Sequence, residues 1–378
     1  MFFRRDSKKM CDNYYFCISD LDNYKIMKTT RLLLATALTA VLCAASCGRQ
    51  AEESQLPRDI DESLTGAADQ VFNDVRSFTT NELHTLLVVK DGKVVYERYE
   101  PGHEKEVRHI LWSASKTFTA TAVGFAVQDS LLSVDDKVVS FFTPSELPQE
   151  RNPWLEQLTV KNLLTMSSGF EPIHAGIPEA GVDYDWAATE LGRPMYFEPG
   201  TRFHYDSFDS YLLSVIVSRV TGQRLDEYLD AKLFTPLGIT GWYWETSPQN
   251  YSAGGWGLYL KPESITKMGQ FLLQKGRWEG RQLLSEAWVE EATAPQIMQW
   301  AGTDPTPEQL EAYAANDKKC GYGYQVWNCP GGGFRLDGAH GQYCYVFPEK
   351  QLVVSCFAST ATTQLLRDSI MKNIVSRY

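Results

Sequence analysis

The clearest strand signals of this chain lie near its two ends, with helical patterns between them, and this distribution constrains the fold more than any other feature. Residues 86–96 read Leu-Leu-Val-Val-Lys-Asp-Gly-Lys-Val-Val-Tyr, and an Asp-Gly pair between two β-rich runs predicts a hairpin. We expect one antiparallel sheet assembled from both ends of the chain. Three more strand-like runs follow near the C-terminus, at 322–327, 342–347 and 352–357.

The segments around and between these strands show the spacing of amphipathic helices. Apolar residues repeat at helical intervals over 58–80 and again from Leu365 to Val375. The predicted fold class is α+β, an antiparallel sheet flanked by N- and C-terminal helices, with an inserted, mostly helical lobe. In a domain spanning 58–378, the sheet lobe would comprise 58–109 and 301–378, and the helical lobe 110–300. Helical stretches in the middle cover 114–129, 159–166, 208–220, 224–233 and 262–275.

Residues 27–47 have the pattern of an export signal. A basic head is followed by a 14-residue apolar stretch from Leu32 to Ala45, which matches a signal-peptide core and is too short to span a bilayer comfortably. The run Ala-Ala-Ser-Cys that ends at Cys47 resembles the lipobox of bacterial lipoproteins, in which the cysteine is lipidated. Ordinary signal-peptidase cleavage nearby is the alternative.

The segments on either side of this signal complete the interpretation of the N-terminus. Residues 1–26 are interpreted as an extension from a misplaced start codon, and 48–57 as a polar tether. The protein is then expected to be exported, as a periplasmic or outer-membrane lipoprotein of a bacterium. Its only membrane contact would be a lipid anchor at Cys47.

Composition excludes several classes of function. Of 378 residues 43% are apolar, enough for a large core, and 47 acidic against 36 basic residues argue against nucleic acid as the main partner. The 6 His are scattered with no pair at ligand spacing, so no metal or other cofactor is predicted. Beyond the tether, cysteines occur at 320, 329, 344 and 356, and their spacing is equally compatible with disulfides and with buried free thiols.

The pattern Ser-x-x-Lys occurs three times, and only its context separates the copies. The copy at 264–267 follows Lys-Pro-Glu at a helix start, where the serine is interpreted as a cap, and the copy at 369–372 lies in the terminal helix with a solvated lysine. The copy at 113–116 opens a helix that is too apolar to be exposed. Lys116 should be buried one turn below Ser113, because positions i and i+3 share a helix face.

A buried lysine beneath a serine hydroxyl can produce a nucleophile without histidine. Burial disfavours the ammonium and lowers the pKa of Lys116, and a neutral amine can accept the proton of Ser113. The N-terminus of the helix would favour the negative charge that develops there. The alternative is a capping serine beside a structural lysine.

Ser113–Lys116 followed by Thr-Phe-Thr resembles the first motif of the serine β-lactamase and penicillin-binding protein superfamily. The likeness is strongest to the branch of class C β-lactamases, D-alanyl-D-alanine carboxypeptidases and esterases. It runs in order from about 85 to 360, nearly the whole chain after the tether. The later landmarks are 158–170 (LTVKNLLTMSSGF), 198–207 (EPGTRFHYDS), 235–239 (TPLGI), 253–258 (AGGWGL) and 338–342 (GAHGQ).

The resemblance implies roles for individual residues. Ser113 is similar to the acylated nucleophile, Lys116 to its proton partner and Tyr205 to the tyrosine of the second motif, whose phenol would relay a proton if Lys116 holds it partly ionised. The third motif falls on Ala339-His340-Gly341. The backbone N–H groups of Ser113 and of the next residue, Gln342, would then form the oxyanion hole.

Departures from the family pattern indicate the substrate class. The second motif has Ser207 where Asn is expected, and the third lacks Lys and Thr, so strong carboxylate recognition is not expected. This combination is more similar to the 6-aminohexanoate-dimer hydrolase and carboxylesterase group. The predicted substrate contacts are Ser207, His340, Gly341, Tyr184 and Trp186, although His340 also fits a polar strand end and Trp186 a packing anchor.

These observations predict a serine hydrolase that forms an acyl-enzyme on Ser113 and cleaves a small-molecule ester or amide. A β-lactamase or a D-alanyl-D-alanine carboxypeptidase is the first alternative. A non-catalytic ligand-binding protein of the same fold is the second.

Overall fold

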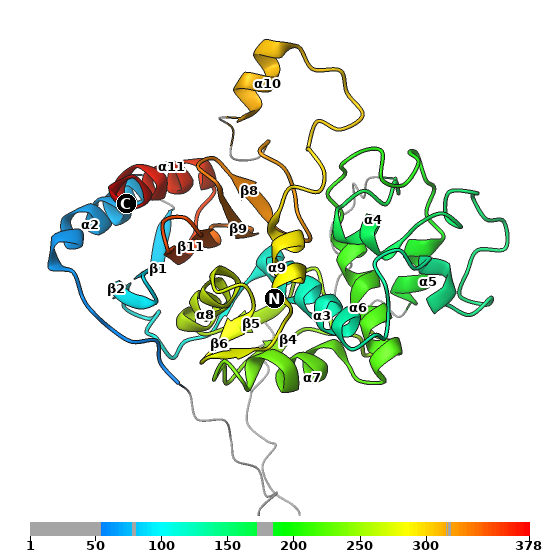
Figure 1. The fold of residues 1–378 in the computed structure, drawn as a ribbon, viewed down its shortest axis with the longest axis horizontal. Coiled ribbons are helices and arrows are strands. Elements are labelled where there is room, and N and C mark those ends of the chain that lie inside the picture. The colour runs from blue at the N-terminus through cyan, green and yellow to red at the C-terminus, as the bar shows by residue number, and fades with distance from the viewer. Residues whose placement is uncertain (1–53, 78–80, 172–183, 315, 317–318) are drawn as a thin grey trace, which may run out of the picture. The chain divides into compact units, whose positions relative to one another are not determined.

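A six-stranded antiparallel sheet with the order β2-β1-β11-β10-β9-β8 forms the centre of the fold (Figure 1). The structure, a computed structural model, describes residues 54–77, 81–171, 184–314, 316 and 319–378. Strands from the N-terminal part pair directly with the last strand of the chain, as predicted. The strands are β1 (Glu82–Lys90), β2 (Lys93–Tyr99), β8 (Trp327–Cys329), β9 (Gly333–Gly338), β10 (Gln342–Phe347) and β11 (Leu352–Ser359).

The predicted hairpin and two of the three predicted C-terminal strands are confirmed. Asp91 and Gly92 both have positive φ, 50° and 78°, which a two-residue turn between β1 and β2 requires. The expected strand at 322–327 is wrong, because this segment makes only isolated bridges before β8 begins. Gln325 has φ of 60° and donates its side-chain amide to the carbonyls at the end of a helix of the other lobe, which breaks the extended path.

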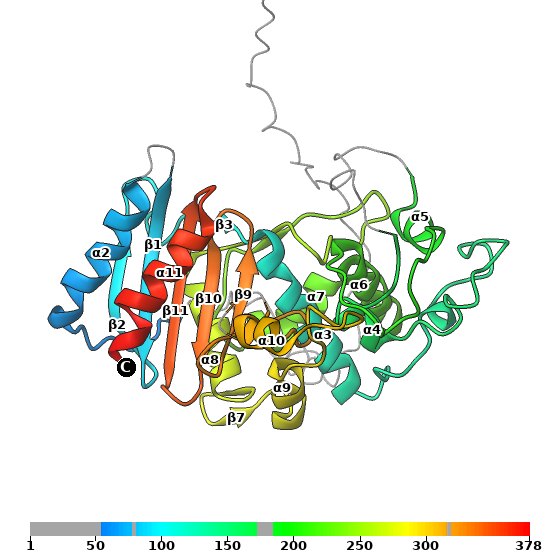
Figure 2. The same cartoon turned by 90° about the horizontal axis from the view of Figure 1, so that it is seen from above.

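Helices cover both faces of the sheet (Figure 2). α2 (Thr65–Arg76) and α11 (Thr363–Asn373) lie side by side on one face, where Tyr343 and Tyr345 join their core. α8 (Pro262–Leu273) lies on the opposite face, against Cys344 and Val346. Alternate residues of β10 therefore face different helices, as the period of a strand requires. The predicted boundaries had placed the 262–275 helix in the helical lobe, whereas it packs on the sheet.

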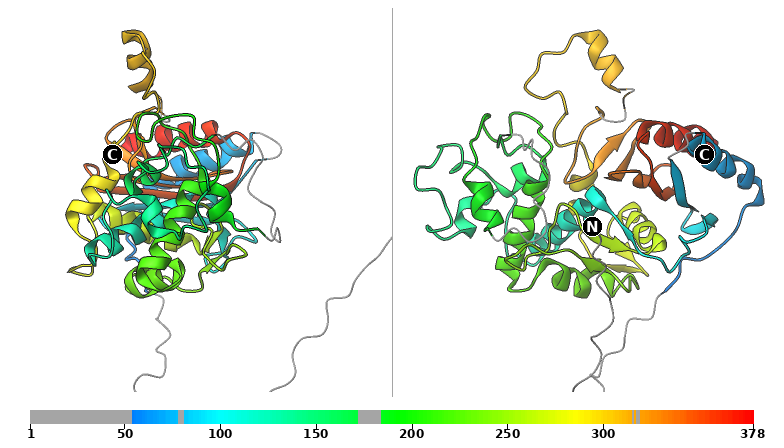
Figure 3. Two further views of the ribbon diagram at one scale, coloured as in Figure 1. Left: turned by 90° about the vertical axis from the view of Figure 1, so that its right-hand side faces the viewer. Right: turned by 180° about the vertical axis from the view of Figure 1, so that it is seen from behind.

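The helical lobe is inserted between β2 and β8, and α3 lies between the sheet and α6 (Figures 1 and 3). In the described part of the chain, no helix has the length and apolar character needed to cross a membrane. The helices of this region are α3 (Ser115–Gln128), α4 (Val160–Leu164), α5 (Trp186–Leu191), α6 (Ser207–Thr221), α7 (Leu225–Leu229), α9 (Glu286–Thr293) and α10 (Pro307–Ala314).

Short elements complete the chain. A small sheet has the order β3-β5-β4, and β6 pairs with β7. These strands are β3 (His109–Ile110), β4 (Tyr243–Trp244), β5 (Leu258–Leu260), β6 (Arg277–Trp278) and β7 (Arg281–Gln282). The short helical turns are η1 (Glu62–Leu64), η2 (Trp112–Ala114), η3 (Val138–Phe141), η4 (Asp230–Phe234) and η5 (Val375–Arg377).

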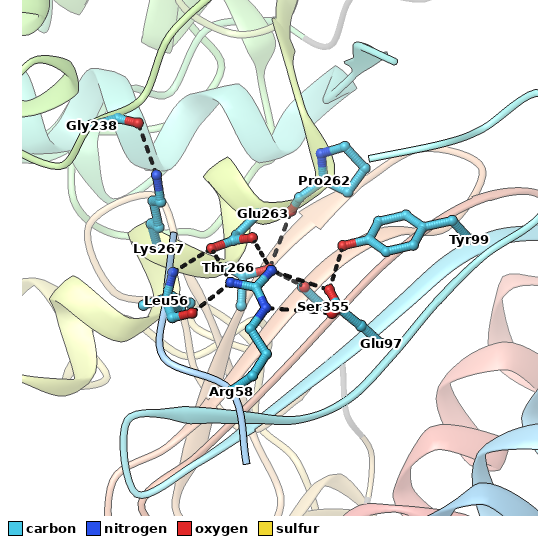
Figure 4. A network of polar contacts seen from close by, with 10 residues as sticks. All are labelled: Leu56, Arg58, Glu97, Tyr99, Gly238, Pro262, Glu263, Thr266, Lys267 and Ser355. Atoms are coloured by element: carbon cyan, nitrogen blue, oxygen red, sulfur yellow. Dashed lines mark hydrogen bonds and ion pairs between the residues drawn. The ribbon is translucent and has the colours of Figure 1, made fainter. Parts of the chain in front are cut away.

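The last residues of the predicted tether are packed against the domain (Figure 4). Leu56 is only 6% exposed and donates its N–H to Glu263 at the start of α8. Arg58 forms ion pairs with that same carboxylate and with Glu97 of β2. A partly buried Arg between two carboxylates fixes this segment, so the ordered domain begins before residue 58. Residues 1–53, which include the predicted signal peptide and Cys47, lie outside the described residues.

Cys344 and Cys356 are free thiols. Cys344 lies opposite Ser355, and Cys356 opposite Tyr343, so the pairing register is one residue away from a cross-strand disulfide. The two thiols consequently face opposite sides of the sheet, one toward α8 and the other toward α11. For this pair the structure has free thiols, one of the two possibilities left open by the spacing.

Candidate active site

The predicted nucleophile lies in a constrained turn at the start of α3. Trp112, immediately before Ser113, has φ of +47°, which a bulky residue rarely adopts. Ser115 holds this turn in place, since its hydroxyl donates to the Trp112 carbonyl at 2.6 Å and accepts from the N–H of Leu258 in β5 at 3.2 Å. Backbone strain that is held by surrounding contacts is typical of functional sites.

Lys116 is 1% exposed, and its amine is surrounded by three oxygen atoms. Its Nζ lies 3.1 Å from Ser113 Oγ, 3.0 Å from Ser207 Oγ and 2.6 Å from the carbonyl oxygen of Gly255. Burial lowers its pKa to about 7, although the carboxylates of Asp206, Asp209 and Asp337 act in the opposite direction. A neutral amine has two N–H groups for Gly255 and Ser207, which leaves its lone pair to accept the proton of Ser113.

Tyr205 completes this group from a distant part of the chain. Lys116 Nζ lies 4.9 Å from the centroid of the Tyr205 ring, and the Ser113 side chain acts to lower the pKa of the phenol, against the effect of burial. Tyr322 and Trp327 pack against the ring, with centroid distances of 6.3 and 5.7 Å. Burial raises the pKa of Tyr205, so the phenol is neutral at ordinary pH rather than partly ionised.

Ser207 and Gly255 also contact the amine of Lys116. Ser207 is the first residue of α6, where Asp206 caps the helix by accepting the Phe208 N–H at 2.8 Å. A Cβ built on Gly255 would lie 2.4 Å from the Ser207 carbonyl oxygen, so only glycine brings this backbone close enough to reach Lys116. Sequence reasoning missed the Gly255 carbonyl as a partner of Lys116; the glycine-rich run at 253–258 was its only signal.

A buried polar cluster lies beneath the amine. Arg193 forms ion pairs with Asp206, at 2.8 Å, and with Glu190, which is 2% exposed. Burial, followed by the neighbouring Asp206 carboxylate, raises the pKa of Asp209 well above its usual range. The same two causes raise the pKa of Glu190 to about 8. The Asp206 carboxylate of this cluster is the charge that acts most strongly on Lys116.

The end of β9 contacts the nucleophile turn. A Cβ built on Gly338 would lie 2.2 Å from the Leu111 carbonyl oxygen and 3.3 Å from the Ala114 nitrogen. The Gly338 carbonyl accepts the Gly341 N–H at 3.3 Å, so it points toward the β9–β10 turn. Because the Gly338 carbonyl and the Ala339 N–H belong to the same trans peptide unit, this N–H points the other way, toward the edge that β8 leaves uncovered after Arg335.

The remaining residues of this turn mainly support its shape. Gln342 pairs with Gly338 across the hairpin, and its buried side chain bonds the Ala339 carbonyl at 2.8 Å and both backbone groups of Ala358. Gly341 is buried beside Leu366 and Ala358. His340 is exposed, with its ring edge-on to Trp112 at a centroid distance of 5.7 Å.

The loop before the second motif is described only from residue 184 onward, because 172–183 lie outside the described residues. Trp186 is 4% exposed and packs against Trp256 and Tyr211, with centroid distances of 5.8 and 5.4 Å. This arrangement fits the packing anchor rather than a substrate contact. Tyr184 is half-buried, and its carbonyl accepts from Gln249 at 2.9 Å.

The fold and this arrangement of groups define the β-lactamase and transpeptidase class of structures. A solved Bacillus anthracis protein named as a 6-aminohexanoate-dimer hydrolase superposes with a TM-score of 0.66 over 86% of this chain and 87% of that chain, at 18% identity, which shows the shared fold. Residues 80–371 match the Beta-lactamase family, and the chain belongs to it. This family contains hydrolases with esterase, amidase and carboxypeptidase relatives.

Two named relatives show the range of that family. A protein of Escherichia coli (strain K12) that carries the name of a D-alanyl-D-alanine carboxypeptidase is 25% identical over 57% of this chain. The match covers 55% of that relative, so the chain spans about half its length. The 6-aminohexanoate-dimer hydrolase of Paenarthrobacter ureafaciens is 24% identical over 71% of this chain and 70% of its own length.

Proposed function

We propose that the protein is a serine hydrolase that forms an acyl-enzyme on Ser113 and cleaves the ester or amide bond of a small molecule. The observation that carries the proposal is the buried amine of Lys116, 3.1 Å from the Ser113 hydroxyl and beneath the Tyr205 ring. A lysine with its pKa near 7 is a competent general base at neutral pH.

The proposed reaction proceeds in two halves. Ser113 Oγ attacks the substrate carbonyl while its proton passes to Lys116 Nζ. The resulting ammonium returns a proton through the neutral Tyr205 phenol to the leaving amine or alkoxide, and the bond to the leaving group breaks. Water then attacks the acyl-enzyme with the same groups as base, which releases the acid and restores Ser113.

We further propose that the N–H groups of Ser113 and Ala339 form the oxyanion hole, with Ala339 in place of the predicted Gln342. The N–H of Ala339 follows the contact of Gly338 with the nucleophile turn and points to the open strand edge. The N–H of Gln342 lies on the other arm of the hairpin, in register with Gly338. Two backbone donors at this point would stabilise the tetrahedral intermediate.

Charge near the third motif favours substrates without a carboxylate. Asp337, at the end of β9, pairs with Arg335 at 2.8 Å, and its charge acts on both Lys116 and Tyr205. A carboxylate at this position repels an anionic substrate, whereas a neutral ester or amide is accepted. This favours the esterase and amidase side of the family over β-lactams and D-alanyl-D-alanine peptides, which carry a carboxylate.

A fluorophosphonate probe tests the nucleophile. We expect it to label the wild type and the Ser264→Ala control but not Ser113→Ala. An unlabelled wild type would favour the ligand-binding alternative.

In a panel of p-nitrophenyl esters, short amides, D-Ala-D-Ala peptides and nitrocefin, we expect the esters and amides to be turned over fastest. Faster turnover of nitrocefin or of the peptides would move the assignment to the first alternative.

We also propose export and lipidation at Cys47, on the strength of the apolar segment and the small residues before the cysteine. Metabolic labelling with an alkyne fatty acid in a bacterial host should mark the wild type and not Cys47→Ala. Labelling that persists in Cys47→Ala would contradict the assignment of the anchor.

A further inference from the structure

Three histidines that are separate in the sequence come together at one end of the main sheet, beside the start of β1. His84 belongs to β1, His103 follows β2, and His109 forms β3. One ligand atom from each ring lies within 4.8 Å of the others. No sequence pattern indicates this cluster, because the residues are 19 and 6 positions apart and only the fold makes them neighbours.

The backbone is shaped to aim these rings at one another. The pairing of β1 with β11 passes from Leu83 opposite Ala358 to Thr85 opposite Phe357, so His84 is the extra residue of a bulge. A bulge redirects a side chain from the regular alternation of a strand. A turn then brings His103 back over β1, with the His103 N–H donating to Glu100 at 2.9 Å and the Glu100 N–H to His84 at 2.8 Å.

Two of the rings carry buried nitrogen atoms with no hydrogen-bond partner among the described residues. His109 is 9% exposed, stacks on Phe357 at 4.6 Å, and its Nε2 is unpartnered. His84 Nδ1 is unpartnered as well, whereas its Nε2 lies 3.5 Å from Glu82. A buried polar atom without a partner is costly and calls for an explanation such as an ion.

We propose that His84, His103 and His109 bind Zn²⁺ or a divalent transition ion of similar size, with water or Glu82 in the fourth position. Three imidazoles with one further ligand suit a tetrahedral zinc site. The three nitrogens lie within 4.8 Å of one another, and Zn–N bonds of about 2.0–2.1 Å require them to move closer together. The rings of His84 and His103 are stacked at 3.7 Å and 5°, and a metal binds in the plane of each ring, so His103 must tilt on its turn.

The ion would have a structural role. It joins β1 and the turn after β2 to β3, and β3 ends three residues before Ser113. The Lys116 amine, the Ser113 hydroxyl and the Tyr205 phenol of the proposed reaction are not held by these histidines. The metal site is therefore independent of the proposed hydrolysis.

Titration of the full chain with Zn²⁺ by calorimetry tests the site. We expect one equivalent to bind, and His103→Ala to weaken this binding at least about tenfold, since even second-shell changes cost that much. His103 is the decisive variant because it lies half-buried on a turn, whereas His109→Ala risks misfolding. His340→Ala, which removes an exposed histidine elsewhere, should bind like the wild type.

Thermal unfolding and cobalt spectroscopy supply independent readouts. Zn²⁺ should raise the Tm of the wild type but not of His103→Ala. Co²⁺ in the same site should give tetrahedral d–d bands without the thiolate charge-transfer band that the chain's cysteines would produce. The proposal is overturned if no ion binds, if His103→Ala binds as tightly as the wild type, or if the spectrum shows thiolate ligation.

Discussion

Two Ser-x-x-Lys motifs in this protein have a buried lysine, and only one of these lysines lies against the hydroxyl of its serine. Lys116 and Lys267 are both 1% exposed, and each lies one turn after its serine at the start of a helix. The amine of Lys116 lies 3.1 Å from Ser113 Oγ, whereas that of Lys267 donates to the Gly238 carbonyl at 2.8 Å. The same four-residue spacing would serve the proposed chemistry at Lys116, whereas at Lys267 it serves the docking of α8 (Figure 4).

The backbone before each serine accounts for the difference. Trp112, whose backbone has a left-handed conformation, turns the chain so that Ser113 lies just before the N-terminus of α3. Ser264 is instead the third residue of α8, inside a helix that already begins at Pro262 and packs on the sheet. Lys261, not Ser264, is the N-cap, so the predicted cap is wrong. The proposed reactivity of Ser113 therefore depends on the further contacts of the Lys116 amine, with Ser207 and Gly255, and not on the four-residue motif alone.

Replacing each lysine with methionine tests this comparison, and it is the change for which we expect the largest effect. Lys116→Met removes the base at nearly constant volume and should lower kcat/KM for an ester substrate by about 10³-fold, within the range of ~10²–10⁴ typical of general-base loss. Lys267→Met leaves the Gly238 carbonyl without this donor and should cost about 1–3 kcal/mol of unfolding free energy while kcat/KM is kept. Steady-state kinetics and urea unfolding measure the two. The comparison fails if Lys267→Met loses activity as strongly as Lys116→Met.

Tyr205→Phe tests the phenol, which is the third group of the proposed reaction beside Ser113 and Lys116. Removal of the phenol should lower kcat by about 10²-fold, because protonation of the leaving group then depends on water. Tyr211→Phe is the matched control: its buried hydroxyl bonds Ser247 at 3.0 Å in the same lobe. Substrates with a good leaving group should lose less than those with a poor one. If substrates with good and with poor leaving groups lose the same factor in kcat, Tyr205 has only a structural role.

The sequence predicts the framework and the reacting groups better than their supporting contacts. The Asp91-Gly92 turn and the apolar α3 follow from local patterns, and Ser113 and Lys116 share a helix face by spacing alone. The contact of Gly255 with Lys116 and the proposed role of Ala339 involve backbone atoms, which no side-chain motif identifies. The histidine cluster depends on a bulge at His84 and on a long-range strand pairing, and both are properties of the tertiary structure.

Gly255→Ala should affect the amine without touching its chemistry. The new Cβ would lie 2.4 Å from the Ser207 carbonyl oxygen, so the backbone must shift and the carbonyl withdraws from Lys116. We expect a loss of about 1–3 kcal/mol in unfolding free energy, typical of overpacking, and a drop of roughly tenfold in kcat/KM. Gly66→Ala, where a Cβ meets nothing within 4 Å in α2, is the control and should be neutral or stabilising. Unchanged activity in Gly255→Ala would show that this carbonyl does not hold the base.

The smallest expected effect concerns the charge beneath the amine. The neutral form of Lys116 is the base, so kcat/KM should rise with pH through a midpoint near 7, where burial has placed the pKa. The Asp206 carboxylate favours the ammonium, so Asp206→Asn should lower this pKa further and move the midpoint to lower pH by a fraction of a unit. Asparagine keeps an oxygen for the Phe208 N–H, so the start of α6 is retained.

Asp226→Asn removes a carboxylate that is 2% exposed and paired with Arg224, and its profile should match that of the wild type. The sign of the shift is the informative result, because loss of a stabilising contact alone would lower the rate at every pH. A lowered midpoint makes Asp206→Asn relatively more active than the wild type below pH 7, while a general defect leaves the midpoint in place. A midpoint that moved upward would mean that the Asp206 carboxylate does not act on Lys116, and the charge that favours its ammonium form would have to be sought elsewhere.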